Sequence, residues 1–313
     1  MKLSITPKPR PTPSLPTILA WAIAFIGIAL LLPRLLSFAK IASDFLAWPW
    51  QFDFTEGINL NATSELAAGH NIYRLSNPST FVSTPYTPLF YFITAPITWL
   101  VGPSLAVGRI ISLLATLTIA ALLAIAVAKT TTRWQIGILT AALWLSISPV
   151  IVWSTLYTQH LPALALGFGG LVWVMLNPKA QGISFFVGPL LLALAFFTKQ
   201  SVIDVTAAVV IWLFVANPRY AIRFGLTLTA MIAVPFFTAN FLLKGGLWEH
   251  TVANQNGLPS SDRRFNRLLA RLWTEHWPLL STGILTTIGT VIALITSVLP
   301  NQKNTQYAAR STQ

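Results

Sequence analysis

The chain has 313 residues, of which 54% are hydrophobic and only 9% charged, and its net charge is +12. Soluble domains carry roughly 25% charged residues, so this composition excludes a soluble globular protein and indicates that lipid is the main solvent. The basic residues are scattered between apolar runs, which is typical of loops beside anionic headgroups and argues against a nucleic-acid partner. The sequence contains no cysteine, so no disulfide holds any loop.

An apolar run from Thr17 to Phe38 follows a basic, proline-rich segment, 1–16. At about 1.5 Å per residue, this run spans roughly 33 Å, which is enough to cross the hydrocarbon core. A cleavable signal has a shorter core of about 7–15 residues, so we predict a retained anchor and a cytoplasmic N-terminal tail. The further runs predicted to span the membrane are 107–128, 135–153, 160–176, 182–198, 202–216, 224–243 and 277–299.

The predicted fold is therefore all-α, a polytopic membrane protein with about eight transmembrane helices. One further apolar run, 88–101, is short and contains Pro96, which favours an interfacial or re-entrant helix. With that run at the interface, the short loops carrying Lys129, Lys179 and Arg219 all face the cytoplasm, as the positive-inside rule expects.

This topology places the acidic residues and the histidines outside, or near the outer end of a helix. The external surface then consists of two segments, 39–106, which we expect to carry juxtamembrane helices, and 244–276. In the second segment, residues 263–271 predict a basic amphipathic helix on the membrane surface. Its charges oppose the positive-inside rule, but long loops influence topology weakly. Segment 277–299 is the last predicted span and 300–313 a cytoplasmic tail.

The first external segment contains Asp53-Phe54-Thr55-Glu56, shortly after two tryptophans suited to the membrane interface. One interpretation is a capping box, in which Asp53 accepts the first free amides of a helix and Glu56 reaches back. The other interpretation is chemical, with a carboxylate at the membrane surface acting as a general base. The two are compatible, because a capped helix start holds a carboxylate rigidly.

A second candidate is Lys199-Gln200, which ends one apolar run, with Asp204 just inside the next. A charge so close to hydrocarbon is costly unless it is paired or functional. Lys199 either extends to the headgroups, paired with Asp204, or binds a phosphate. The four histidines have no metal-ligand spacing, so no metal site is predicted from them.

Several short motifs stand in the order and spacing of a known family. They are Asp53-x-x-Glu56-Gly57, Leu66-Ala67-Ala68-Gly69 with Ile72-Tyr73, Tyr86-Thr87-Pro88-Leu89-Phe90-Tyr91, Gly108-Arg109 and Ala195-Phe196-Phe197-Thr198-Lys199-Gln200. Together they resemble the C-type (GT-C) glycosyltransferase superfamily, in particular the group of protein mannosyltransferases and lipid A aminoarabinose transferases. The resemblance covers residues 20–255 and predicts a GT-C-like transmembrane core, 17–243.

Members of this superfamily take a sugar from a polyprenyl-phosphate carrier and pass it to an acceptor on the extracytoplasmic face. The resemblance implies an inverting glycosyltransferase in the bacterial inner (plasma) membrane, with Asp53 as general base and Glu56 beside it in the catalytic site. It also implies that Lys199, Gln200 and Arg109 bind the lipid phosphate. The sequence specifies neither the donor sugar nor whether the acceptor is a glycan, a lipid or a protein.

The sequence departs from the family at two places. Many members have a basic residue or histidine before Pro-Pro-Leu, where this chain has Tyr86, and an acid where the fourth spanning helix begins, where this chain has His160. We expect both residues to bind substrate. No cofactor is expected, and a divalent metal stays an open alternative. The alternative functions are a transporter or flippase, which commonly has repeated halves and midplane charges that this sequence lacks, and a truncated, inactive family member.

Overall fold

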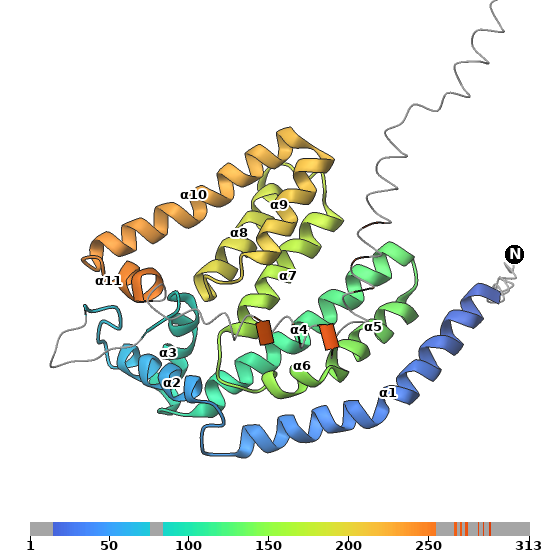
Figure 1. The fold of residues 1–313 in the computed structure, drawn as a ribbon, viewed down its shortest axis with the longest axis horizontal. Helices are drawn as coiled ribbons and strands as arrows, with labels where there is room; N and C mark the ends of the chain where they lie inside the picture. Colours follow the sequence, from blue (N-terminus) through green and yellow to red (C-terminus); the bar gives the residue numbers. More distant parts are fainter. Residues whose placement is uncertain are drawn as a thin grey trace, which may run out of the picture. The chain divides into compact units, whose positions relative to one another are not determined.

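The computed structural model describes residues 15–75 and 84–254, and single helical positions between 266 and 288. Throughout the described ranges every regular element is a helix (Figure 1), which confirms the predicted all-α class. The chain divides into two units, 1–256 and 257–313, and the first carries all the elements named below. Residues 1–14 of the predicted N-terminal tail, the predicted C-terminal tail, and most of the predicted basic helix and last span lie outside the described residues, while residues 15 and 16 already belong to the first helix.

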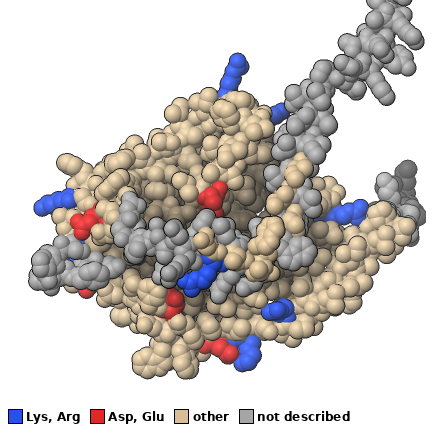
Figure 2. Space-filling view, viewed as in Figure 1, with Lys and Arg blue, Asp and Glu red and all other residues tan. Residues whose placement is uncertain are grey.

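Three helices are long and apolar enough to cross a membrane: α1 (Leu15–Ala47), α4 (Leu105–Thr131) and α10 (Pro218–Leu242). Their apolar side chains face outward to a large extent, as at Phe25 (75% exposed) and Leu226 (67% exposed). Such surfaces are stable in lipid and not in water. The chain is therefore a membrane protein. Charged side chains are sparse on the visible face of the molecule, as Figure 2 shows.

Five described helices are apolar but shorter: α3 (Leu89–Val101), α5 (Trp134–Ser146), α7 (His160–Leu176), α8 (Ile183–Thr198) and α9 (Asp204–Ala216). Helices of this length extend about 20–25 Å, which is less than the roughly 30 Å of the hydrocarbon core. The predicted count of eight spans therefore stays a prediction. The predicted bounds 160–176 and 182–198 agree with α7 and α8 to within one residue.

The run 135–153 does not form the single helix that was predicted. It forms α5 and a short helix, α6 (Ser148–Trp153), which are separated at Ile147. Ile147 is extended (φ −72°, ψ 125°), and Pro149 lies in the first turn of α6. Proline has no N–H to continue the ladder of α5, so the helix stops and restarts there.

The helices pack as a row in which α1 contacts α5, α5 contacts α4, α4 contacts α7, and α7 contacts α8, with α9 and α10 beyond (Figure 1). Small residues permit close approach between neighbours. At Gly137, for example, a Cβ would lie 2.4 Å from the carbonyl oxygen of Ala124 on the facing helix. The core between α7, α8, α9 and α10 is apolar and includes Leu192, Leu213 and Phe224.

Short elements cover the row on one side, where α7 begins and α8 ends: α2 (Phe54–Ala67), α3, α11 (Gly246–Trp248) and a π-helical turn, η1 (Glu249–Ala253). Helix α2 packs on α3, and both contact α4 (Figure 1). The predicted interfacial run 88–101 is thus the short helix α3. This side also receives the beginning of α7 and the end of α8, which bring His160 and Lys199 to it.

Candidate functional site

Asp53 caps the N-terminus of α2. Its backbone is extended (φ −133°, ψ 143°), and its Oδ1 accepts hydrogen bonds from the N–H of Thr55, at 2.8 Å, and from the Thr55 hydroxyl. The predicted cap is therefore confirmed. The second carboxylate oxygen, Oδ2, has no hydrogen-bond partner among the described residues. Asp53 is held firmly by one oxygen and has the other available.

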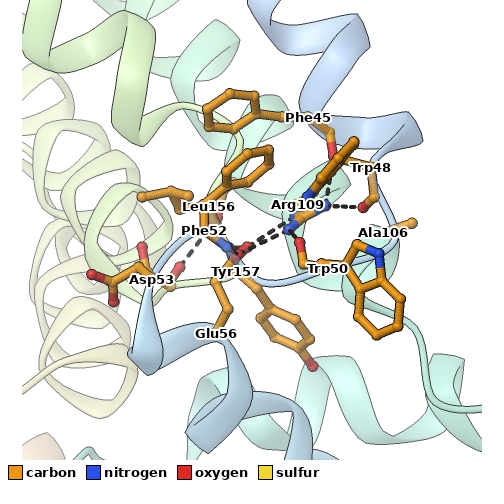
Figure 3. A network of polar contacts seen from close by, with 12 residues as sticks. Phe45, Trp48, Trp50, Phe52, Asp53, Glu56, Ala106, Arg109, Leu156 and Tyr157 are labelled. Atoms are coloured by element: carbon orange, nitrogen blue, oxygen red, sulfur yellow. Dashed lines mark hydrogen bonds and ion pairs between the residues drawn. The ribbon is translucent and has the colours of Figure 1, made fainter.

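Glu56, one turn further along α2, is fully buried. Its carboxylate forms a bidentate ion pair with Arg109, with Nε–Oε1 and Nη2–Oε2 distances of 2.9 Å (Figure 3). It also accepts hydrogen bonds from the N–H of Phe52 at 2.8 Å and the N–H of Tyr157 at 2.9 Å. Burial opposes ionisation, but hydrogen bonds from Arg109, Tyr157 and Phe52 outweigh it, so the pKa of Glu56 lies below its ordinary value.

Arg109, on α4, uses all five of its N–H donors within the protein. Besides its two bonds to Glu56, it donates to the carbonyl oxygens of Phe45, Trp48 and Trp50 at 2.5–2.8 Å (Figure 3). The guanidinium also lies 5.1 Å from the ring centroid of Phe52. These contacts join the end of α1, the loop before α2, and α4 into one unit, here called the Glu56–Arg109 anchor.

The anchor changes the interpretation of two predicted site residues. Arg109 has 0% exposure and no donor left for a lipid phosphate, so the structure does not support its predicted phosphate contact. Glu56 is equally inaccessible and its oxygens are occupied, so its contacts agree with the expectation that it holds the local backbone and orients Asp53. Both residues instead fix the position of Asp53, which directly precedes α2.

Lys199 lies where α8 ends and its backbone becomes extended (φ −157°, ψ 113°). Its Nζ is 2.5 Å from Nδ1 of His160, the first residue of α7, and 5.5 Å from the ring centroid of Tyr86. None of the described ion pairs joins Lys199 to Asp204, the pairing considered from the sequence. Burial lowers the pKa of Lys199 to about 8. It is thus a cation that is only partly solvated.

Asp53 belongs to the same cluster. Its negative charge acts electrostatically on both Tyr86 and His160. Burial first, and the charge of Asp53 second, raise the pKa of the Tyr86 phenol. Tyr86, His160 and Lys199 are in contact, Asp53 lies within electrostatic reach of Tyr86 and His160, and all four predicted site residues are partly accessible. This set is called the Asp53–Lys199 cluster below.

Gln200 holds the segment that carries Tyr86. Its amide Nε2 donates to the carbonyl oxygens of Pro85 at 2.8 Å and Thr251 at 3.1 Å, and its Oε1 accepts from the N–H of Thr87 at 3.3 Å. The amide is therefore committed to the protein and not to the phosphate contact predicted for it. Its effect is to keep Tyr86 beside Lys199.

A buried polar network beneath the cluster was not identified from the sequence. Asn59 donates to the carbonyl oxygen of Tyr157 at 2.7 Å and accepts from Gln159 at 2.6 Å, while the Tyr157 hydroxyl donates to Thr63 at 2.8 Å. A Cβ at Gly108 would overlap the Tyr157 ring, which explains the glycine there. The signal was available, because positions 56, 59 and 63 are polar at helical spacing on one face of α2.

An apolar cavity of about 360 Å³ adjoins the cluster at His160. Its other walls come from α5, α6 and the start of α7, namely Trp144, Ile147, Pro149, Val150, Trp153 and Leu161. The Trp153 and His160 rings meet edge to face, with centroids 5.2 Å apart. The break between α5 and α6 therefore helps to form a hydrophobic recess that ends at a polar site.

Among the described residues, no three His, Cys, Asp or Glu side chains are grouped closely enough to hold a metal ion. The chain matches no known protein-family model, no curated protein and no solved structure. A function therefore has to be argued from the chemistry of the Asp53–Lys199 cluster and the apolar cavity beside it.

Proposed function

We propose that this protein is a membrane glycosyltransferase, which moves a sugar from a polyprenyl-phosphate donor to an acceptor with inversion at the sugar. The observation that carries the proposal is the Lys199–His160 pair beside an apolar cavity, within electrostatic reach of Asp53, whose Oδ2 has no described hydrogen-bond partner. The motif order that resembles the GT-C superfamily supports the same chemistry.

The phosphate and the isoprenoid chain of the donor each have chemically suitable surroundings at the proposed site. Its phosphate cannot enter hydrocarbon without a counter-ion, and Lys199 provides a cation at the end of a membrane helix. Its isoprenoid chain is apolar and fits the recess of α5, α6 and α7 that ends at His160. We place the first isoprenoid units there, with the phosphate between Lys199 and His160 and with Tyr86 against the sugar.

The transfer is a single displacement. Oδ2 of Asp53 takes the proton from the acceptor, the acceptor's lone pair forms the new bond to the anomeric carbon, and the bond from that carbon to the phosphate oxygen breaks. The electron pair leaves with the polyprenyl phosphate, whose charge Lys199 stabilises. General-base catalysis of this kind contributes typically about 10²–10⁴-fold. A single displacement inverts the configuration at the anomeric carbon, which is also what the resemblance to the GT-C superfamily implies.

The proposed topology has eight spans, cytoplasmic termini and α3 at the interface, which places the cluster on the extracytoplasmic face of the bacterial inner membrane. Two exposed positions test it, Gln51 between α1 and α2 and Gln181 between α7 and α8. Because the chain has no cysteine, a membrane-impermeant thiol reagent applied to intact cells should label the Gln51→Cys variant and not the Gln181→Cys variant. Labelling of the Gln181→Cys variant alone would show that the topology is the reverse of the one proposed.

The function is tested by incubating purified protein in bilayers with radiolabelled polyprenyl-phosphate sugars and a mixture of glycan, lipid and protein acceptors. We expect the label to move from at least one donor to an acceptor, and Asp53→Asn to abolish most of this transfer. Asp44→Asn is the matched control, because Asp44 is an exposed acid whose described ion pair is with Lys40. Movement of intact donor across the bilayer, without sugar transfer, would show a flippase instead.

A further inference from the structure

A second cavity lies at the opposite end of α8 from Lys199. It has a volume of about 1000 Å³ and is formed by the turn between α7 and α8 together with the start of α10. Helix α8 runs from Ile183 to Thr198, so the two sites are about 24 Å apart along its axis. Figure 1 shows α8 between α7 and α10, and it contacts both. This second cavity is called the basic cavity.

Among the described residues, the basic cavity is lined by three cations, Lys179, Arg219 and Arg223, and by no carboxylate. None of the described ion pairs includes any of the three. The Arg223 guanidinium lies 5.6 Å from the ring centroid of Phe185, which fixes its side chain over the cavity wall. Three cations with no described counter-ion, close together at helix ends, produce a strong local attraction for an anion.

Gln181, Asn217 and Thr227 also line the cavity, and another part of its wall is apolar and continues onto the outward-facing surface of the helices. Phe186 on α8 is 47% exposed and Leu226 on α10 is 67% exposed, and both line the cavity. Beside them on the same helices, Ile183 and Ile222 are 89% and 54% exposed. A small soluble anion would leave this apolar wall uncovered, whereas a molecule with an anionic head and hydrocarbon chains would cover both parts.

We propose that the basic cavity binds an anionic phospholipid. The phosphodiester headgroup lies between Lys179, Arg219 and Arg223, and the acyl chains extend along Phe186 and Leu226. Basic pockets between membrane helices commonly bind such headgroups, and a volume of about 1000 Å³ is at the upper end of known ligand sites. Bound there, the lipid holds the start of α8 against the start of α10, at a site separate from the Asp53–Lys199 cluster.

The test uses the purified full-length chain in mixed micelles titrated with phosphatidylglycerol or phosphatidylcholine, with bound lipid counted by native mass spectrometry. Each cation near a membrane surface contributes about 1 kcal/mol, which is roughly fivefold in affinity. We expect Arg219→Gln and Arg223→Gln each to weaken phosphatidylglycerol binding about fivefold, and the double variant about 25-fold. Phosphatidylcholine binding should be weak and unchanged in all of them.

Two controls separate this site from general attraction. Lys129→Gln removes an exposed cation of α4 outside the cavity and should leave binding unchanged. Leu226→Gln keeps every charge but removes apolar surface, and should weaken binding of the lipid and not of inorganic phosphate. The proposal is overturned if the wild type binds both lipids equally or if Lys129→Gln matches the cavity variants. It is also overturned if inorganic phosphate displaces phosphatidylglycerol at equal concentration. Circular dichroism of each variant verifies that the helices are intact.

Discussion

The Glu56–Arg109 pair and the Lys199–His160 pair both join elements on the same covered side of the helix row, yet their surroundings are opposite. Glu56 and Arg109 are fully buried, and every donor of the guanidinium is used. Lys199 and His160 are partly exposed, and beyond each other and neighbouring aromatic rings they have no described hydrogen-bond or ion-pair partner. A saturated, sealed charge stabilises a structure, whereas an unsaturated, half-solvated charge can bind a ligand.

The largest expected effect follows from replacing Asp53, the residue that the sealed pair holds in position. Asp53→Asn keeps the shape and the capping ability of the side chain, since Asn is also a good N-cap, but it removes the base. We expect sugar transfer in single-turnover assays to fall by about 10²–10⁴-fold while the variant stays folded and inserted. A wild-type rate in this variant would leave Asp53 as a helix cap and nothing more.

The next effect concerns stability and tests whether the anchor is structural. Glu56→Ala leaves the Arg109 guanidinium buried without its carboxylate, which typically costs about 3–5 kcal/mol. The matched control on the same helix is Glu65→Ala, because Glu65 pairs with Arg74 at 3.3 Å while both side chains are partly exposed. That pair should contribute less than about 1 kcal/mol. Thermal unfolding of both variants in detergent measures the difference, and equal losses would contradict the assignment.

The anchor also shows what the sequence could and could not predict. Asp53 as a cap, and helices α7 and α8, follow from local patterns of polarity and hydrophobic length. The hydrogen-bond partners of Arg109 do not follow from such patterns, because they are carbonyl groups about sixty residues earlier in the chain, which no side chain marks in the sequence. The same holds for Gln200, whose amide bonds to backbone groups of distant segments.

The single helix predicted over 135–153 is wrong, because hydropathy does not register a proline that interrupts the backbone hydrogen bonds. The run 135–153 is mostly apolar, but Pro149 follows Ser148 and marks the break between α5 and α6. The break matters for function because residues on both sides of it line the apolar cavity beside His160. That cavity depends on three helices packing together, and a linear sequence does not specify its shape.

The role of the Lys199–His160 pair in donor binding is tested by Lys199→Ala. A hydrogen bond to a charged group contributes about 1.5–3 kcal/mol, so we expect the donor to bind roughly 10–100-fold more weakly. Lys199→Arg keeps the charge and should retain most of the binding. The measurement is equilibrium binding of a polyprenyl-phosphate sugar to protein in bilayers, with Lys40→Ala as the control, since Lys40 is exposed and pairs with Asp44. Unchanged affinity in Lys199→Ala would show that this lysine only reaches for the headgroups.

The smallest expected effect is a pH dependence of donor binding, which the buried Glu56–Arg109 pair cannot produce. Burial lowers the pKa of Lys199 to about 8, so the ammonium is present below that value and is lost as the pH rises through it. The donor phosphodiester carries one negative charge across this range. If only the charged lysine binds it, affinity falls roughly tenfold between pH 7 and pH 9. Binding should then also take up a proton, because the bound anion favours the ammonium.

The Lys199→Arg variant makes this effect specific, because arginine stays charged over the whole range. Its donor affinity should be flat between pH 7 and pH 9, whereas the wild-type affinity declines. A matching decline in Lys199→Arg would assign the titration to another group. A flat wild-type profile would mean that binding of the donor's phosphate does not depend on the charge of Lys199. The Lys199–His160 pair would then differ from the Glu56–Arg109 pair in exposure but not in function.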